Sequence, residues 1–157
     1  MRDRPHRSTA SRATLLLALL LCVAPVHAAQ IAPPDLTTSS RLVWATMTTL
    51  DNANRTSNYS VLRDLGSGAF QLNNSVMNLG TIFRELRANR VDVGRAIMIE
   101  PTFYLPPAVD DTGVLRLRGG FEFRPRSLRF DLLFVFEQGG WRLHGISVVE
   151  VASNTPR

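Results

Sequence analysis

Three stretches between residues 113 and 151 alternate apolar and polar side chains, the pattern of strands with one buried face. From Val114 to Arg124 the odd positions hold leucine, glycine or phenylalanine, while most even positions hold arginine or glutamate. A second run from Leu128 to Glu137 places leucine and phenylalanine on one face, and a third extends from Trp141 to Val151. The pattern predicts an antiparallel meander with one apolar and one charged face.

The turn between the last two runs sets the predicted register. Gly139-Gly140 is a two-residue loop that tolerates positive φ at both positions, which favours a tight hairpin. This hairpin places Phe134 opposite Gly145 and Phe130 opposite Val149. The inward row of the last strand is then Leu143, Gly145, Ser147, Val149 and Val151. On the charged face the register predicts Glu137 opposite Arg142 and Arg129 opposite Glu150, and a similar turn at Pro125-Arg126 would place Glu122 opposite Arg129.

The chain before residue 95 shows helical spacing in three places. The first helix has the apolar stripe Leu36, Val43, Trp44, Met47 and Leu50, ends near Ala53, and has Asp35 or Thr38 as its N-cap. A short helix from Tyr59 to Leu65 stops at Gly66. The third begins near Asn74 or Ser75, with the stripe Val76, Leu79, Ile82, Phe83 and Leu86.

Alternation returns between Arg95 and Leu105, where Pro101 indicates an edge strand or a bulged one. The order of elements predicts an α+β fold. Three N-terminal helices pack on the concave face of a curved antiparallel sheet of about four strands, which forms a cone-shaped roll.

The first 29 residues have the features of a signal peptide. Four arginines precede an apolar run from Ala13 to Val26, and Val26-His27-Ala28 ends in the small residue that a signal peptidase prefers. We expect a signal peptide over 1–29, a lead-in over 30–35, one domain over 36–151 and a C-terminal tail over 152–157. The expected location is the periplasm or the outside of a bacterial cell, without membrane insertion after cleavage.

Cleavage would change the chemistry and the charge of the protein. Cys22, the single cysteine, would leave with the signal, which excludes a disulfide framework, a thiol nucleophile and a cysteine metal site. Cleavage would remove four arginines and Asp3, so that 14 arginines and 12 acidic residues remain. The formal charge would therefore fall from +5 to +2. This charge does not favour nucleic-acid binding. No motif indicates a cofactor or a metal.

Several residues support a resemblance to a known family. They are Trp44 with Leu50-Asp51, Asn58-Tyr59 through Leu62, Phe83 with Leu86-Arg87, and Gly140-Trp141-Arg142-Leu143. In these residues the chain resembles the nuclear transport factor 2-like (cystatin-like, SnoaL-like) α+β superfamily, over about residues 36–151, and is most similar to short exported bacterial members. The resemblance implies a cone in which sheet and helices enclose a pocket. It does not imply one function, because the superfamily includes isomerases, cyclases, dehydratases, scaffolds and ligand carriers.

The candidate pocket residues follow from the predicted inward rows and from the aromatic side chains. They are Trp44, Tyr59, Phe83, Leu117, Phe134 and Ser147, with core packing as the alternative reading of Trp44 and Tyr59. Gly119 and Gly145 would leave space near Ser147, either for a helix or for a ligand. His144, the one histidine after residue 29, is placed on the charged face and interpreted as a surface or interface residue.

An apolar patch interrupts the charged face and is a candidate dimer interface. Its residues in the predicted register are Leu133, Val135, Ile146 and Val148, and the C-terminal tail or the loop 106–113 could cover it instead. The sequence therefore favours a non-catalytic domain that binds a small apolar ligand or a protein partner through the cone or the outer sheet face. The alternative is a small-molecule enzyme with acid–base chemistry, which would require a titratable group inside the cone. The predicted register supplies none.

Overall fold

The computed structural model describes residues 31–153, so the predicted signal peptide and the tail residues 154–157 lie outside the described residues. The described part forms five α-helices, one 3-10 helix and five strands of one open antiparallel sheet. The predicted α+β class is confirmed, whereas the counts of three helices and about four strands are wrong. No helix in residues 31–153 is long and apolar enough to span a membrane.

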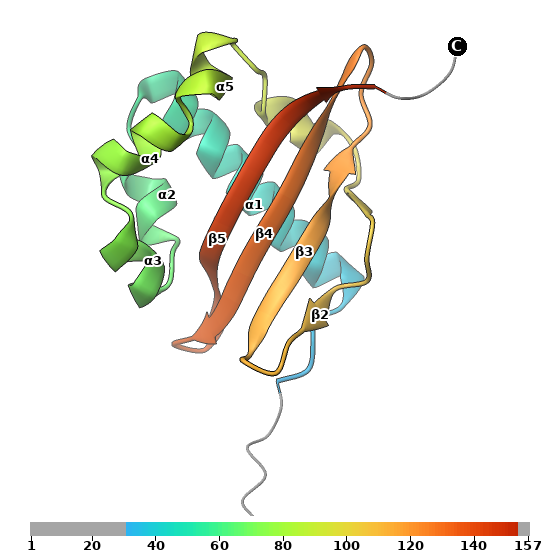
Figure 1. Ribbon diagram of the computed structural model, residues 1–157. Coiled ribbons are helices and arrows are strands. Elements are labelled where there is room, and N and C mark those ends of the chain that lie inside the picture. The colour runs from blue at the N-terminus through green and yellow to red at the C-terminus, as the bar shows by residue number, and fades with distance from the viewer. Residues whose placement is uncertain (1–30, 154–157) are drawn as a thin grey trace, which may run out of the picture.

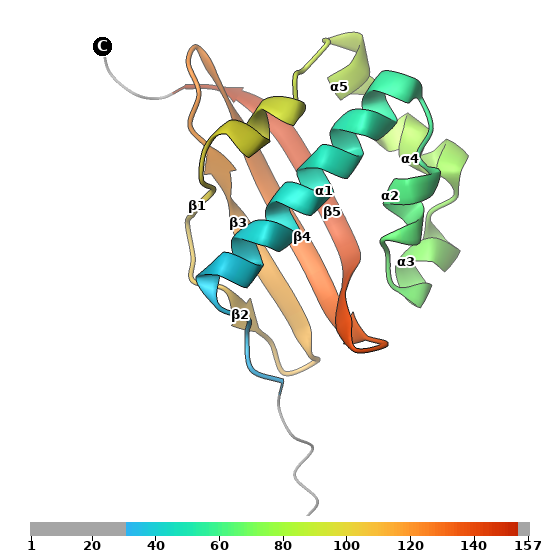
Figure 2. The same cartoon turned by 180° about the vertical axis from the view of Figure 1, so that it is seen from behind.

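Helix α1 (Leu36–Thr56) lies across one face of the sheet (Figure 1, Figure 2). It begins at Asp35, whose carboxylate accepts a hydrogen bond from the backbone N–H of Thr38 at 2.6 Å. This N-cap satisfies a backbone donor that the first turn leaves unpaired. Val43, Met47 and Leu50 are fully buried against the sheet, as the stripe predicts.

The remaining helices lie beside the last strand rather than across the sheet (Figure 2). They are α2 (Ser60–Asp64), α3 (Gly68–Asn73), α4 (Val76–Ile82) and α5 (Arg84–Ala88). The sequence missed α3, a short helix that Ser67 caps by accepting a hydrogen bond from Phe70 N at 3.2 Å. It also merged α4 and α5, which are separate because the backbone leaves helical geometry at Phe83. This break buries Phe83 and leaves Ile82 51% exposed.

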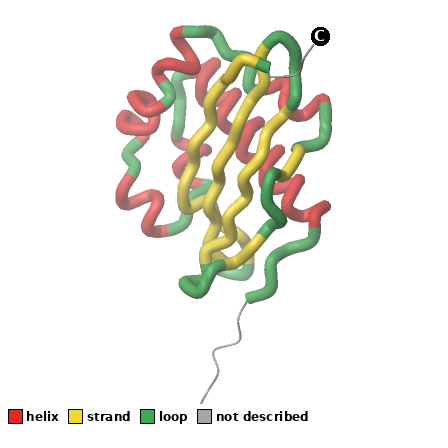
Figure 3. Tube along the Cα trace, turned by 45° about the vertical axis from the view of Figure 1, so that its right-hand side comes forward, coloured by secondary structure: helices red, strands yellow, loops and turns green. Residues whose placement is uncertain are grey.

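The sheet has the order β1-β3-β4-β5, and β2 also pairs with β3 (Figure 3). Its long strands are β3 (Val114–Phe121), β4 (Arg126–Glu137) and β5 (Gly140–Ala152); β1 (Thr102–Phe103) and β2 (Ala108–Val109) are short. The predicted strand from Arg95 is wrong in its first half, where the 3-10 helix η1 (Gly94–Met98) forms. The Asp92 carboxylate accepts a hydrogen bond from Arg95 N at 3.2 Å and so favours a helical turn there.

The β4–β5 register differs from the prediction at two points. The turn is Gln138-Gly139, with φ of 52° and 78°, so that Glu137 faces Gly140 and not Arg142. Further along, Leu133 pairs with Gly145 while Phe134 pairs with Leu143, which leaves His144 as the extra residue of a β-bulge.

The bulge reverses which side chains of β5 face the core. Beyond it Phe130 pairs with Val148, and Arg129 pairs with Val149 instead of Glu150. Val148 is 5% exposed and Val149 48% exposed, so the predicted inward position of Val149 is wrong. The predicted inward position of Ser147, which is exposed, and the predicted outward positions of Ile146 and Val148 are wrong for the same reason.

The interior between α1 and the sheet is filled by side chains. Leu117, Phe130 and Phe134 are at most 3% exposed and belong to one core cluster with the buried face of α1. Phe130 also contacts the ring of Phe121, with ring centroids 5.6 Å apart. Leu117 and Phe134 are therefore core residues, packed among other buried side chains.

The outer face of the sheet carries the charged residues that the alternation predicts. Asp131 accepts hydrogen bonds from Arg116 Nε at 2.8 Å and from Arg118 Nη2 at 2.6 Å. The hydrogen bond from Arg116 is the main cause that lowers the pKa of Asp131, with Arg118 acting in the same direction. Arg129 also pairs with Glu122 at 3.0 Å, although Gly120 is its partner in the strand register.

Candidate functional site

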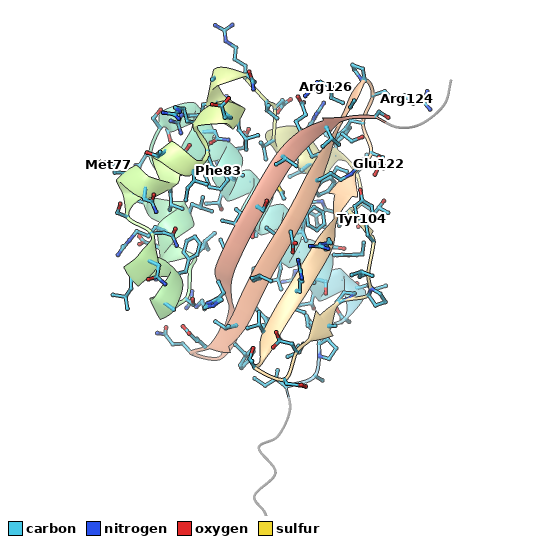
Figure 4. The ribbon with its side chains drawn as sticks, viewed as in Figure 1. Met77, Phe83, Tyr104, Glu122, Arg124 and Arg126 are labelled. Atoms are coloured by element: carbon cyan, nitrogen blue, oxygen red, sulfur yellow. The ribbon has the colours of Figure 1, made fainter. Side chains whose placement is uncertain are left out.

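A groove of about 430 Å³ separates α4 and α5 from the free edge of β5. Phe83 lies on the side of the helical layer that faces β5 (Figure 4). The lining residues come from the two helices, the segment after them and the edge of the sheet: Ile82, Phe83, Glu85, Leu86, Asn89, Val91, Arg126, Ile146, Ser147, Val148, Val149 and Glu150. Apolar side chains from both walls therefore meet in this groove.

Five consecutive residues of β5, 146–150, line the groove. Successive side chains of a strand point to opposite faces of the sheet, so a cavity that contacts all five must lie along the strand edge. In Figures 1 and 2 this edge of β5 faces α4 and α5. The other edge of β5 is paired with β4. The main chain of β5 is thus part of the groove wall.

The hydrogen bonds of β5 show which of its peptide groups face the groove. Leu143 accepts a bond from Ser67 N at 2.8 Å and donates to Leu65 O at 3.2 Å, so its main chain points away from β4. At the other end Ser153 N donates to Pro125 O at 3.0 Å, toward β4. In an antiparallel pair of strands, residue pairs that exchange hydrogen bonds alternate with pairs that do not. These two observations therefore show which β4–β5 pairs are hydrogen-bonded.

On β4 the odd residues from Pro125 to Leu133 therefore bond to β5, and the even residues do not. The β5 partners of the even residues Leu132, Phe130 and Leu128 are Ile146, Val148 and Glu150. These three residues direct their N–H and C=O groups to the open edge. Within residues 31–153 no hydrogen bond from these groups to another segment is found.

One end of the groove is closed by charged residues. Glu150 lies on the inner side of β5, with its side chain 16% exposed, and its two oxygens accept bonds from Arg95 Nη2 at 2.9 Å and from Arg126 Nε. The guanidinium of Arg95 lies 4.6 Å from the centre of the Phe123 ring. The prediction that the inner side has no titratable group is wrong, because the bulge turns Glu150 inward.

The predicted pocket residues are not brought together. Phe83 and Ser147 line the groove, Leu117 and Phe134 are buried in the core, and Tyr59 is 1% exposed and stacks on Phe83. Trp44 lies on α1, where its indole N–H donates to Ile99 O at 3.2 Å. Ile82 and Glu150 also line the groove, although the sequence analysis did not propose them as site residues. Only the position of the bulge would have indicated Glu150.

His144 occupies the bulge and points toward the helices rather than the outer face. Its Nδ1 lies 3.0 Å from the hydroxyl of Ser67. Ser67 is fully buried and its hydroxyl also caps α3, so this serine is not accessible to a substrate. This Ser–His pair holds the segment 65–67, which connects α2 and α3, against the strand. No group of three or more potential metal ligands occurs within residues 31–153.

Comparisons with protein-family models, with curated proteins and with solved structures find no match to this chain. The resemblance to the nuclear transport factor 2-like superfamily therefore stays a prediction.

Proposed function

We propose that this protein is an exported, non-catalytic binding domain that holds an extended peptide segment of a partner protein in the groove beside β5. The observation that carries the proposal is the open edge of β5, whose unpaired peptide groups face a wall that includes Ile82, Phe83 and Leu86. A peptide in β conformation satisfies such an edge by adding a strand, and its side chains then occupy the flanking pockets.

The geometry supports a segment of a few residues. From Ile146 to Glu150, three residues direct their peptide groups to the open edge. They span four residue steps, about 13 Å of strand. Alternate side chains of an added strand would contact Ile82, Phe83 and Leu86 on the helical wall. The same edge is already used in this way at Leu143, where the chain's own residues 65–67 form a parallel bridge. An incoming segment would extend that pairing toward Glu150.

The walls of the groove favour a peptide over a second folded copy of the chain. The helical layer stands beside the edge of β5, so a whole sheet edge from another domain would collide with α4 and α5 (Figure 1). A single extended segment needs only the space between them. A small apolar ligand would also fit the apolar walls, but it would leave the N–H and C=O groups of β5 unpaired, which is costly away from water.

The charged groups support a binding role over acid–base catalysis. Both oxygens of Glu150 already accept hydrogen bonds from guanidinium groups, so this carboxylate has no position prepared for a substrate proton. His144 is bound to a buried serine. A general base must reach the proton that it removes, and neither residue is placed for that.

Three earlier predictions stay with this proposal. Export follows from residues 1–29, and membership of the nuclear transport factor 2-like superfamily follows from the resemblance. A homodimer through the outer sheet face would now use Leu133 and Val135 without Ile146 and Val148, because the bulge turns the latter two inward.

A selected peptide tests the groove directly. Dodecapeptides displayed on phage are selected against the protein, and the best peptide is titrated by fluorescence polarisation against wild type and Ile82→Trp. The larger side chain fills the groove, so the affinity should fall by about tenfold or more. Leu72→Trp, at a site on α3 that is 88% exposed, should leave the affinity within about twofold.

N-methylation of the selected peptide distinguishes strand addition from burial of an apolar side chain. Methylating alternate peptide nitrogens should weaken binding by about fivefold or more each, and the intervening nitrogens should have little effect. A separate titration with the neutral fluorophore N-phenyl-1-naphthylamine tests whether the groove binds a small apolar ligand instead. If the fluorophore binds and no selected peptide shows the alternating N-methyl effect, the peptide proposal is wrong.

A further inference from the structure

A second pocket of about 430 Å³ lies where the end of α1 meets α5 and the segment after it. Most of its lining residues carry a charge: Asp51, Asn54, Arg55, Leu86, Arg87, Arg90, Val91 and Asp92. Three arginines and two aspartates give this lining a formal charge of +1. Leu86 and Val91 also line the β5 groove, so the two pockets flank the same stretch of chain.

Arg87 is held in a fixed position at this pocket. Its Nη1 donates a hydrogen bond to the hydroxyl of Tyr59, and its guanidinium lies 5.4 Å from the centre of the Tyr59 ring. Tyr59 is 1% exposed and its hydroxyl donates in turn to Asn54 Oδ1 at 2.7 Å. This buried chain of hydrogen bonds orients the guanidinium before any ligand arrives, which reduces the entropy lost on binding.

The positive charge of Arg87 has no carboxylate partner in the described part of the chain. The same holds for Arg90, whereas Asp51 lies 3.8 Å from Arg55 and Asp92 accepts the backbone N–H of Arg95. The amide nitrogen of Asn54 is buried and has no partner in residues 31–153. The pocket therefore combines two uncompensated guanidinium groups with an unsatisfied donor.

We infer that this pocket binds the oxyanion group of a small molecule, a carboxylate or a phosphate. A guanidinium presents several N–H donors in a fixed planar fork that matches two oxygens of either group. One hydrogen of Arg87 is used by Tyr59, so the rest of its fork is available for the anion. Arg90 adds a second positive charge on the more exposed side. This site is separate from the peptide proposal and does not depend on it.

Isothermal titration calorimetry with two probes tests the site. Sodium phosphate and sodium succinate are titrated separately into the protein at ionic strength held constant with sodium chloride. At least one anion should bind wild type, and the probe that binds identifies the oxyanion. Arg87→Gln should weaken this binding by about tenfold or more.

Matched variants separate anion binding from general charge and from folding. Arg84→Gln removes the same charge from α5 outside the pocket, so the affinity should change by less than about twofold. Arg90 is an exposed lining residue, so the Arg90→Gln variant should fold normally. It should weaken anion binding by about threefold or more. If neither anion binds wild type at concentrations of about 50 mM, or if Arg84→Gln and Arg87→Gln weaken binding equally, the inference is overturned.

Discussion

Replacing Phe134 with alanine should lower the free energy of unfolding by about 3–5 kcal/mol. The ring is 2% exposed and lies in the core between α1 and the middle of the sheet. Its removal loses buried apolar surface and leaves a cavity that the surrounding strands cannot fill completely. Urea denaturation of wild type and variant measures the difference directly.

Phe136 in the same strand provides the matched control. Its side chain is 44% exposed and contacts the ring of Trp141, with ring centroids 5.4 Å apart. Phe136→Ala should therefore lower the free energy of unfolding by only about 1 kcal/mol. Equal losses for the two variants would mean that the interior is not packed as described, and that a cavity around Phe134 is available to a ligand after all.

The second large effect distinguishes two neighbouring valines of β5. Val148→Asp should lower the free energy of unfolding by about 3–5 kcal/mol, because it places an unpaired carboxylate in the core. Val149→Asp should change it by less than about 1 kcal/mol, because that side chain lies on the exposed outer face. Thermal unfolding followed by circular dichroism compares the two variants.

The alternation in the sequence predicts the opposite order, with Val149 inside and Val148 outside. The experiment therefore measures on which side of the β-bulge each residue lies. A larger loss for Val149→Asp would restore the uninterrupted register. It would also remove Glu150 from the inner side and return Ile146 and Val148 to the predicted dimer patch.

The long regular elements could be predicted because their periodicity reports burial. The stripe of α1 and the three long strands follow from patterns that depend on one buried face, and the N-cap at Asp35 is one of the two residues that the sequence offered. The α+β class follows from the order of those elements. Short elements could not be predicted in the same way, because they have no stripe: α3 depends on the Ser67 cap, and the turn into η1 depends on the hydrogen bond from Arg95 N to the Asp92 carboxylate.

The groove was missed because a single residue decides it. His144 adds one position to β5, and every later side chain of that strand changes face. A Cβ atom at Gly145, next to the bulge, would lie 3.0 Å from Leu133 Cδ1 on the neighbouring strand, so the two strands pack closely there. The alternation of residues 141–151 looks equally regular in either register, because Ile146 and Val148 are as apolar as Val149 and Val151. The bonds of Leu143 with residues 65–67 and the bond from Ser153 N to Pro125 O together establish which peptide groups of β5 face the open edge.

The central claim is that β5 presents an unpaired edge to the groove, and amide hydrogen exchange of the free protein tests it residue by residue. The N–H groups of Ile146, Val148 and Glu150 should exchange much faster than those of Ser147 and Val149, which are bonded to β4. Addition of a selected peptide should then protect the three fast amides. Uniform protection of residues 146–150 in the free protein would contradict the open edge, and with it the proposed binding site.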